Sequence, residues 1–588
     1  MNSRVDVLIH FGSPEGRQLY RSPTFLACLL VLLFSLSLYA QQSQEEPSDA
    51  LRGTVINSIT REPISRALVY SPDNRFATLT DAQGRFEFLF PAEQPQGNAD
   101  YKAGTAVPNS NRPYMLTARK PGFLIDPSNE AQGVQLAPQT REVTLALVPE
   151  ALIVGHISLP GSEAPDKVAL ELYRREVRDG LSHWAASAVA TSNSSGEFRF
   201  AELQAGTYKL FTRELPDSDA PNLPGKQQFA YTPVYFPNVS DFASAAEIEL
   251  TPGKVVQADL SPTRQPYFPV RIPVLNVQPG TPLNVIVSMQ GRRGPGYALE
   301  FNAQEQRIEG ALPNGNFTLE ASGEGQSGVV NIVVRGAAVE GPAMVAVPGR
   351  SINVNVKEEF TTNDQTSGSY KVFINNRRSI TARGPRSYLN VNLEPAEDFD
   401  QHSGGSLRDP VSRQDDALVL DAVQPGRYWV RVTSSRGYAS SVTSGGTDLL
   451  HRPLAVGIGG VVSPIEITMR DDTAQVDGTV EGLRPDPADS TGAPDRVSGT
   501  PLASAHVYCI PVEESSGQFT ALPVSADGKI FPFPLPPGTY RVLAFTRPQP
   551  NLEYRNPEAM RAYDGKGPVV RLVAGQTEHL RIPLMRAE

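Results

Sequence analysis

Seven histidines and two cysteines are the residues of this chain best suited to hydrolysis at neutral pH. A zinc peptidase site needs a histidine three residues before a glutamate, together with a distant third ligand. None of the histidines has a glutamate three positions later, and none lies in a His-Glu-x-x-His motif. They stand at His10, His156, His183, His402, His451, His506 and His579. The sequence therefore predicts no metal site and no metallopeptidase activity.

Other catalytic motifs are also missing. The turn around Ser327 reads Gly-Gln-Ser-Gly-Val, so its second glycine comes one position too early for a nucleophile elbow. Cys509 lies in an alternating apolar segment, three residues after His506. Residues three apart on a strand point to opposite faces, so this pair cannot act together. We therefore expect Cys509 to be a small core residue, and the chain to be neither an enzyme nor a cofactor-binding protein.

Ligand binding is harder to exclude, because exposed aromatic rings can stack on the faces of sugars. Several aromatic residues lie in polar or proline-interrupted segments and are weak candidates for such a site. They are Trp184, Tyr231, Tyr235, Phe236, Tyr554 and Tyr563. The alternative is that each ring fills the edge of a domain or a joint between domains. Aromatic content alone does not distinguish the two.

A Gly-x-aromatic-x-apolar pentapeptide recurs along the chain. Its glycines are 109, 111 and 112 residues apart. Such a period is too long for a solenoid repeat and suits β-sandwich domains of about 100 residues. The copies begin at Gly206, Gly315, Gly426 and Gly538. The repeat predicts a row of similar all-β domains.

The pentapeptide also predicts local structure. We expect its glycine to adopt a positive φ in a turn, and its aromatic to start a strand and face the core. The aromatics are Tyr208, Phe317, Tyr428 and Tyr540. Strand-like segments at 195–200 and 527–531 precede two of the copies, and each is expected to form a β-hairpin with the pentapeptide strand.

Composition agrees with this fold class. The 588 residues include 48 glycines and 52 prolines, and 40% are hydrophobic, which favours many short strands around sizeable cores. The net charge is −10 and no basic patch stands out. Nucleic acids and anionic membrane surfaces are therefore not expected partners.

The N-terminal segment resembles a signal peptide. Arg4, Arg17 and Arg21 precede a largely apolar run from Thr24 to Leu38, and Ala40 marks the expected cleavage point. An uncleaved anchor is the alternative, and a lipoprotein site at Cys28 is a weaker one. Cleavage would leave one cysteine, no disulfide and no membrane span.

The segments predicted after this signal at 1–40 are a linker and five β-sandwiches. The linker covers 41–49, and the domains cover 50–148, 149–263, 264–356, 357–472 and 473–588. We expect them to form an extended row rather than a globule.

The first domain shows a resemblance to a known family. A Gly-x-Val opening at Gly53, a Pro-Ile-x-x-Ala-x-Val segment from Pro63 and a Thr-Asp-x-x-Gly-x-Phe-x-Phe turn from Thr80 resemble a carboxypeptidase regulatory-like domain. That module is a transthyretin-like sandwich, grouped with carbohydrate-binding-like folds. The match is weaker over 149–263 and 473–545. Further segments are similar to exported acidobacterial proteins that carry the module in tandem.

Together these features favour tandem transthyretin-like or immunoglobulin-like β-sandwiches. The expected function is that of a non-catalytic binding or structural protein of the cell envelope, in the periplasm, on the outer surface or outside the cell. A polysaccharide is the favoured ligand. Two alternatives stay open: an adhesion or assembly protein that binds an envelope protein through exposed strand edges, and a hydrolase with an unrecognised site. The sequence does not indicate an oligomeric state.

Overall fold

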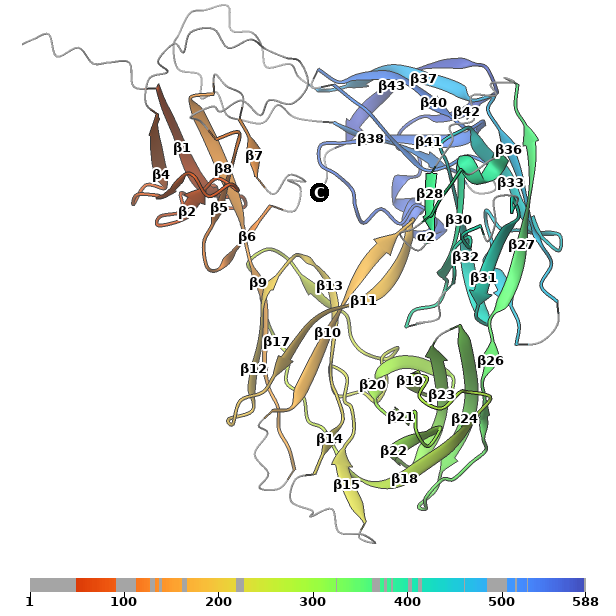
Figure 1. Cartoon of the computed structure of the whole chain (residues 1–588). Helices are drawn as coiled ribbons and strands as arrows, with labels where there is room; N and C mark the ends of the chain where they lie inside the picture. The colour runs from red at the N-terminus through yellow and green to blue at the C-terminus, as the bar shows by residue number, and fades with distance from the viewer. Residues whose placement is uncertain are drawn as a thin grey trace, which may run out of the picture.

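The computed structural model is nearly all β, as expected from the sequence (Figure 1). It describes residues 49–90, 113–126, 133–136, 140–160, 167–217, 227–323, 325–361, 371–374, 378–381, 384–399, 404–410, 415–458, 461–483, 505–512, 515–525 and 527–585. The predicted signal peptide at 1–40 and most of the linker lie outside these residues. In the described part of the chain, no helix has the length and apolar character needed to cross a bilayer.

The first two domains are each built of two sheets. The first contains β1 (Asp49–Asn57), β2 (Leu68–Tyr70), β3 (Ala77–Leu79), β4 (Arg85–Phe90), β5 (Met115–Arg119), β6 (Phe123–Ile125), β7 (Val134–Gln135) and β8 (Glu142–Pro149). The second contains β9 (Ala151–His156), β10 (Ala169–Arg178), β11 (Leu181–Thr191), β12 (Glu197–Leu203), β13 (Gly206–Thr212), β14 (Leu215–Pro216), β15 (Gln228–Tyr231), β16 (Ile248–Leu250) and β17 (Val255–Gln257).

The third domain repeats the two-sheet plan, and the fourth has two such sheets and a separate two-stranded sheet of β28 and β29. The third contains β18 (Arg264–Leu275), β19 (Asn284–Met289), β20 (Arg292–Tyr297), β21 (Glu300–Asn302), β22 (Arg307–Pro313), β23 (Gly315–Gly323), β24 (Gln326–Val334), β25 (Met344–Val345) and β26 (Val347–Pro348). The fourth contains β27 (Arg350–Glu359), β28 (Lys371–Ile374), β29 (Arg378–Thr381), η1 (Gly384–Ser387), β30 (Leu389–Pro395), β31 (Leu418–Val423), β32 (Gly426–Ser434), β33 (Tyr438–Ser444), β34 (Thr447–Asp448), β35 (Leu454–Val456) and β36 (Ile465–Arg470).

The fifth domain closes the chain with strands and one short helical segment. It contains β37 (Ala474–Glu481), β38 (His506–Pro511), β39 (Thr520–Leu522), β40 (Lys529–Leu535), β41 (Gly538–Phe545), α2 (Pro557–Met560), η2 (Arg561–Tyr563), β42 (Val569–Leu572) and β43 (Thr577–Met585). Its strands form one continuous path of pairings.

All five domains share the way in which their opening strand is paired. The opening strand pairs in parallel with a closing strand, as in β1–β8, β9–β17, β18–β25, β27–β36 and β37–β43. The opening strand also pairs antiparallel with β4, β12, β22, β31 or β40. Each domain encloses its own cluster of buried apolar side chains. The tandem β-sandwich prediction is confirmed.

The pentapeptide aromatics are core residues, as predicted. Tyr208, Phe317, Tyr428 and Tyr540 are at most 1% exposed, and each pentapeptide glycine is the first residue of a strand. The three tyrosine hydroxyls each donate a hydrogen bond to a carbonyl four residues upstream, at 2.7–2.8 Å. The buried phenols therefore keep a hydrogen-bond partner, as buried polar groups must.

The glycines are needed for a different reason than expected. Gly206 has φ +154°, but Gly315, Gly426 and Gly538 do not have positive φ. A Cβ on Gly315 or Gly426 would lie 3.0 Å from the ring of Phe317 or the hydroxyl of Tyr428. The aromatic side chain thus folds back over its own glycine, so close approach rather than turn conformation excludes a side chain at these two positions.

The two expected hairpins are wrong. β12 pairs with β9, whereas β13 pairs with β10 in the opposite sheet. Likewise β40 pairs with β37, and β41 pairs with β38. In the second domain the short connection before the pentapeptide crosses from one sheet to the other, and in the fifth domain it joins two strands of one continuous path that are not neighbours.

The expected boundary at residue 263 falls inside a sheet. β14 and β15 pair with each other, and β15 pairs with β18, so the second and third ranges share hydrogen-bonded strands. Arg292 of β20 also reaches back to Asp241 at 2.7 Å. These two domains are therefore joined by pairing as well as by sequence.

The domains do not form an extended row. The hairpin of β10 and β11 reaches out of the second domain to the fourth and fifth (Figure 1). His183 pairs with Asp398 at 3.1 Å, and Phe242 packs on Phe399 with ring centroids 4.8 Å apart. Gln424 of the fourth domain donates to a carbonyl of the third at 3.1 Å. The second to fifth domains therefore contact one another in a closed frame.

Candidate functional site

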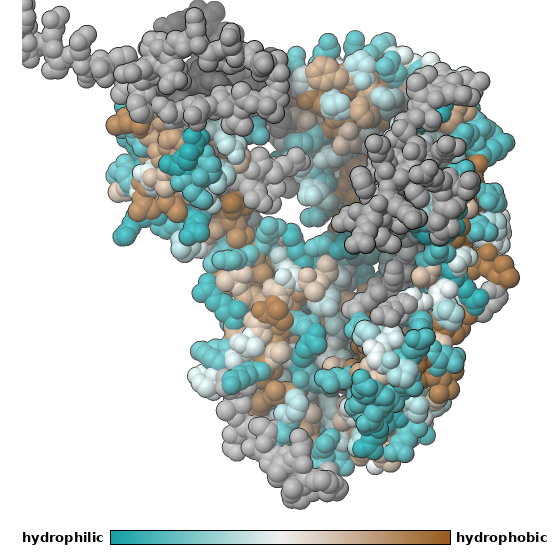
Figure 2. Space-filling view, viewed as in Figure 1, coloured by the Kyte–Doolittle hydropathy of each residue, from teal (hydrophilic) through white to brown (hydrophobic). Residues whose placement is uncertain are grey.

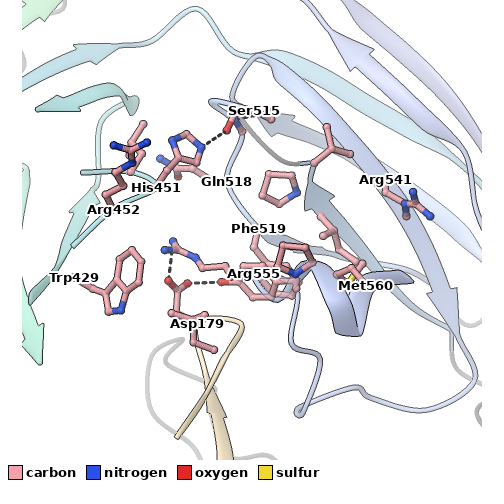
Figure 3. A pocket seen from close by; sticks show the side chains of 18 of the residues that line it. Asp179, Trp429, His451, Arg452, Ser515, Gln518, Phe519, Arg541, Arg555 and Met560 are labelled. Atoms are coloured by element: carbon pink, nitrogen blue, oxygen red, sulfur yellow. Dashed lines mark hydrogen bonds and ion pairs between the residues drawn. The ribbon is translucent and has the colours of Figure 1, made fainter. Parts of the chain in front are cut away.

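A pocket of about 990 Å³ lies where the second, fourth and fifth domains meet (Figure 3). The turn between β10 and β11 forms one wall. β32 and β33 with the segment at 450–452 form the second, and β38, β41, Val512 and the segments at 515–519 and 554–564 form the third. Cavities at domain interfaces are common ligand sites, so we treat this pocket as the candidate site.

The turn that reaches the pocket is fixed by its sequence. Asp179 and Gly180 have φ angles of +46° and +73°, which is the pattern of a type I′ hairpin turn. An Asp-Gly pair between two strand-like segments favours this turn strongly. The long antiparallel strands β10 and β11 then carry Asp179 away from its own domain.

Asp179 joins three side chains of the other domains. Its carboxylate contacts the guanidinium of Arg431 in β32, pairs with Arg555 at 2.8 Å and accepts a hydrogen bond from the hydroxyl of Tyr554 (Figure 3). Burial, and after it the neighbouring Arg555 charge, lower the pKa of Arg431 to about 10. One carboxylate therefore offsets two adjacent positive charges and fastens the hairpin to both domains.

Two more contacts hold the hairpin in place. Arg175 of β10 pairs with Glu553 at 2.7 Å, and the Arg555 amide donates to the Gly180 carbonyl at 3.1 Å. Tyr554 is sandwiched, because Phe519 stacks on one face at 4.1 Å and Gly180 approaches the ring from the second domain. A Cβ on Gly180 would lie 2.7 Å from the ring.

Trp429 supplies the aromatic surface of the fourth-domain wall. It follows Tyr428 in β32, so alternation turns it away from the core that Tyr428 enters. The Arg555 guanidinium lies 5.4 Å from the centre of its ring, within cation–π range. Sequence analysis did not choose Trp429, although a tryptophan on the outward face of a predicted strand was an available signal.

Polar groups complete the walls. His451 pairs with Asp448 through Nδ1 at 2.7 Å, and its Nε2 lies 3.1 Å from the Ser515 carbonyl oxygen, which links the fourth and fifth domains. Arg541 pairs with Asp564 at 3.1 Å. The Gln518 side chain also lines the pocket. The His451 imidazole is therefore occupied by protein partners, and the site combines a large ring with amide and guanidinium donors.

The six aromatic candidates do not gather in one place. Tyr554 alone among them lines this pocket, and both of its faces are covered. Tyr231 and Tyr235 are 1% and 3% exposed, so protein covers their rings and neither is a surface for a sugar. Both residues are buried because they lie where the second domain packs on its own loops and on the third domain.

The other three candidates lie in supporting positions. Trp184 packs on Phe242 at 5.7 Å, and the Lys209 ammonium lies 5.0 Å from its ring centre. Phe236 packs against the core of the second domain. Tyr563 packs edge-on against Phe545 at 5.9 Å. Their role in ligand binding stays a prediction.

The described residues offer little for catalysis. No three histidine, cysteine, aspartate or glutamate side chains among them are grouped as metal ligands. Cys509 is buried, as predicted, and burial raises the pKa of its thiol to about 12. A thiol of that pKa is almost fully protonated at neutral pH and is a poor nucleophile.

Comparisons with known proteins found similar solved structures only. No family model matches the chain, and no curated protein matches it. The Streptococcal ancillary pilin is 12% identical over 55% of this chain and 99% of its own, with a TM-score of 0.18. GBS52, the minor pilin of Streptococcus agalactiae, is 12% identical over 37% of this chain and 97% of its own, with a TM-score of 0.17.

The Bacillus anthracis TIE protein is 12% identical over half of each chain, with a TM-score of 0.14. TM-scores of this size are too low to carry function from those proteins to this chain.

Proposed function

We propose that this chain is an exported, non-catalytic binding protein of the cell envelope that holds a carbohydrate in the pocket between its second, fourth and fifth domains. The signal-like N-terminal segment and the resemblance of the first domain to a carboxypeptidase regulatory-like module support export and binding. A polysaccharide is the ligand that the wall chemistry favours.

One observation carries the proposal: the pocket presents the ring of Trp429 beside several hydrogen-bond donors. A sugar ring has an apolar face for an aromatic side chain and a rim of hydroxyls for amide and guanidinium groups. The pocket volume of about 990 Å³ is at the upper end of ligand sites, which suits a chain segment of several sugar units.

The same walls argue against a hydrolase. Glycoside hydrolysis commonly uses two carboxyl groups, one of which must donate a proton. The two carboxylates that line the pocket are Asp179 and Asp564, and each is paired with arginine. Both carboxylates are engaged by guanidinium groups of the protein rather than free to contact a glycosidic bond.

A glycan array probed with the chain lacking residues 1–40 tests the proposal, followed by calorimetry on each glycan that binds. Trp429→Ala should abolish or strongly weaken binding. Tyr114→Ala is the matched control, because Tyr114 is an aromatic of the first domain, 60% exposed and outside the pocket. Equal affinity of Trp429→Ala and the parent chain, or no glycan bound at all, would contradict the proposal.

Assembly through a strand edge is a second candidate, favoured by the outer half of β11. β11 pairs with β10 and is the edge of its sheet. From Ala185 to Thr191 it carries no charge and no proline, and Val189 is 73% exposed. Charge and proline are the usual protection of such edges. On the face in view, Figure 2 shows hydrophobic residues in separate patches among hydrophilic ones.

Val189→Lys tests this candidate by light scattering across a concentration series. If the edge mediates assembly, the parent chain forms larger species and the variant does not. If the parent chain is monomeric at all concentrations, self-assembly through this edge is ruled out.

A further inference from the structure

The pocket carries a charge opposite to that of the chain. Five arginines line it, namely Arg431, Arg452, Arg541, Arg555 and Arg561, against two aspartates. The whole chain has a net charge of −10. A gathering of guanidinium groups in an acidic protein focuses a local positive field where an anion can enter.

The arginines fall into two groups by their partners. Arg431 and Arg555 are held by Asp179, and Arg541 is held by Asp564. Arg452 and Arg561 are exposed and form no ion pair with any residue that the structure describes. Arg452 stands on the fourth domain and Arg561 on the fifth, so the two unpaired charges belong to different walls of one pocket.

We propose that the pocket selects an acidic polysaccharide, one whose sugar units carry carboxylates, and that Arg452 and Arg561 bind those carboxylates. This inference rests on the proposed carbohydrate-binding function and specifies its ligand. A guanidinium offers two parallel N–H groups that match a carboxylate, and such charge-assisted pairs are stronger than neutral hydrogen bonds. Trp429 lies on the fourth-domain wall with Arg452, so ring and charge line the same pocket.

The test uses trigalacturonate and the neutral galactose trisaccharide as probes, titrated into the chain without residues 1–40 by calorimetry. We expect trigalacturonate to bind at least about tenfold more tightly, and Arg452→Gln or Arg561→Gln to remove about tenfold of that affinity. Added salt should lower the affinity for trigalacturonate and leave the affinity for the neutral trisaccharide unchanged. Arg571→Gln is the matched control, because Arg571 is an exposed arginine of the fifth domain that does not line the pocket.

The outcomes separate the two proposals. Equal affinity for both probes, or loss of affinity in Arg571→Gln as large as in Arg452→Gln, overturns the acidic selectivity and leaves the carbohydrate site standing. Binding of neither probe, together with an empty glycan array, overturns both. Tight binding of trigalacturonate that depends on Arg452 and Arg561 supports both.

Discussion

Replacing Asp179 by alanine should release the β10–β11 hairpin from the fourth and fifth domains. The substitution removes the carboxylate that contacts Arg431, Arg555 and the Tyr554 hydroxyl. It leaves two guanidinium groups side by side, with side-chain exposures of 19% and 30%. With the hairpin docked, the two charges would be partly shielded from water without a counter-charge, and undocking would let water solvate them.

The magnitude lies between two limits. Breaking a fully buried ion pair costs about 3–5 kcal/mol, and an exposed pair contributes about 0–1 kcal/mol. Because these side chains are partly exposed, we expect the docked state to lose about 2–3 kcal/mol. At 1.4 kcal/mol per tenfold, the docking equilibrium shifts by roughly 30- to 150-fold.

Hydrogen exchange over residues 169–191 and small-angle scattering measure this directly. The variant should exchange faster in the hairpin and have a larger radius of gyration. Glu87→Ala is the control, since its pair with Arg52 is exposed, with side-chain exposures of 42% and 69%, and its removal should change neither measurement. Unchanged hydrogen exchange and scattering in Asp179→Ala would refute the role of Asp179 in fastening the hairpin to the fourth and fifth domains.

Three further results are expected. Burial raises the pKa of the Glu214 carboxyl from 4.5 to about 7, so the folded state binds the carboxyl proton more tightly than the unfolded state does. This difference stabilises the fold by about 3 kcal/mol below pH 4.5, and we expect that stabilisation to be lost as the pH rises to 7 and above. Glu214→Gln should flatten that loss in urea unfolding between pH 4 and pH 8, and an unchanged slope would contradict the shift. Tyr428→Ala should destabilise the fourth domain by about 3–5 kcal/mol in calorimetry, because it removes a fully buried ring; a change below 1 kcal/mol would be inconsistent with its burial. N-terminal sequencing of the exported protein should begin near Gln41, whereas an intact 1–40 segment on membranes would favour the anchor.

Local pattern predicted the domains well. The pentapeptide placed Tyr208, Phe317, Tyr428 and Tyr540 in cores, because strand alternation and burial are encoded within a few residues. The same pattern predicted the wrong pairing partners for β12 and β40, the strands before two of the pentapeptides. Two strands that follow each other in sequence can pair with each other or with other strands, and their hydrophobic periodicity is the same in both cases. The exact domain boundaries stay predictions.

The candidate site could not be predicted in the same way. Its walls come from residues about 250 and 375 positions apart, joined by Asp179 to Arg431 and to Tyr554. The Asp179-Gly180 turn was readable as a hairpin, but its destination depends on how domains pack. Tyr554 was a candidate because it is an aromatic residue in a polar segment. In the structure its ring packs between Phe519 and Gly180 at a contact between domains, so neither face is free.

Tryptophan fluorescence tests the central claim most directly, because the chain has only two tryptophans, Trp184 and Trp429. Trp184→Phe leaves Trp429 as the single reporter inside the pocket, and Trp429→Phe leaves Trp184 as the reporter outside it. We predict that titration with trigalacturonate changes the emission of the first variant with saturation and leaves that of the second unchanged. A saturable change in the Trp184 reporter with a silent Trp429 would contradict a carbohydrate site between the second, fourth and fifth domains.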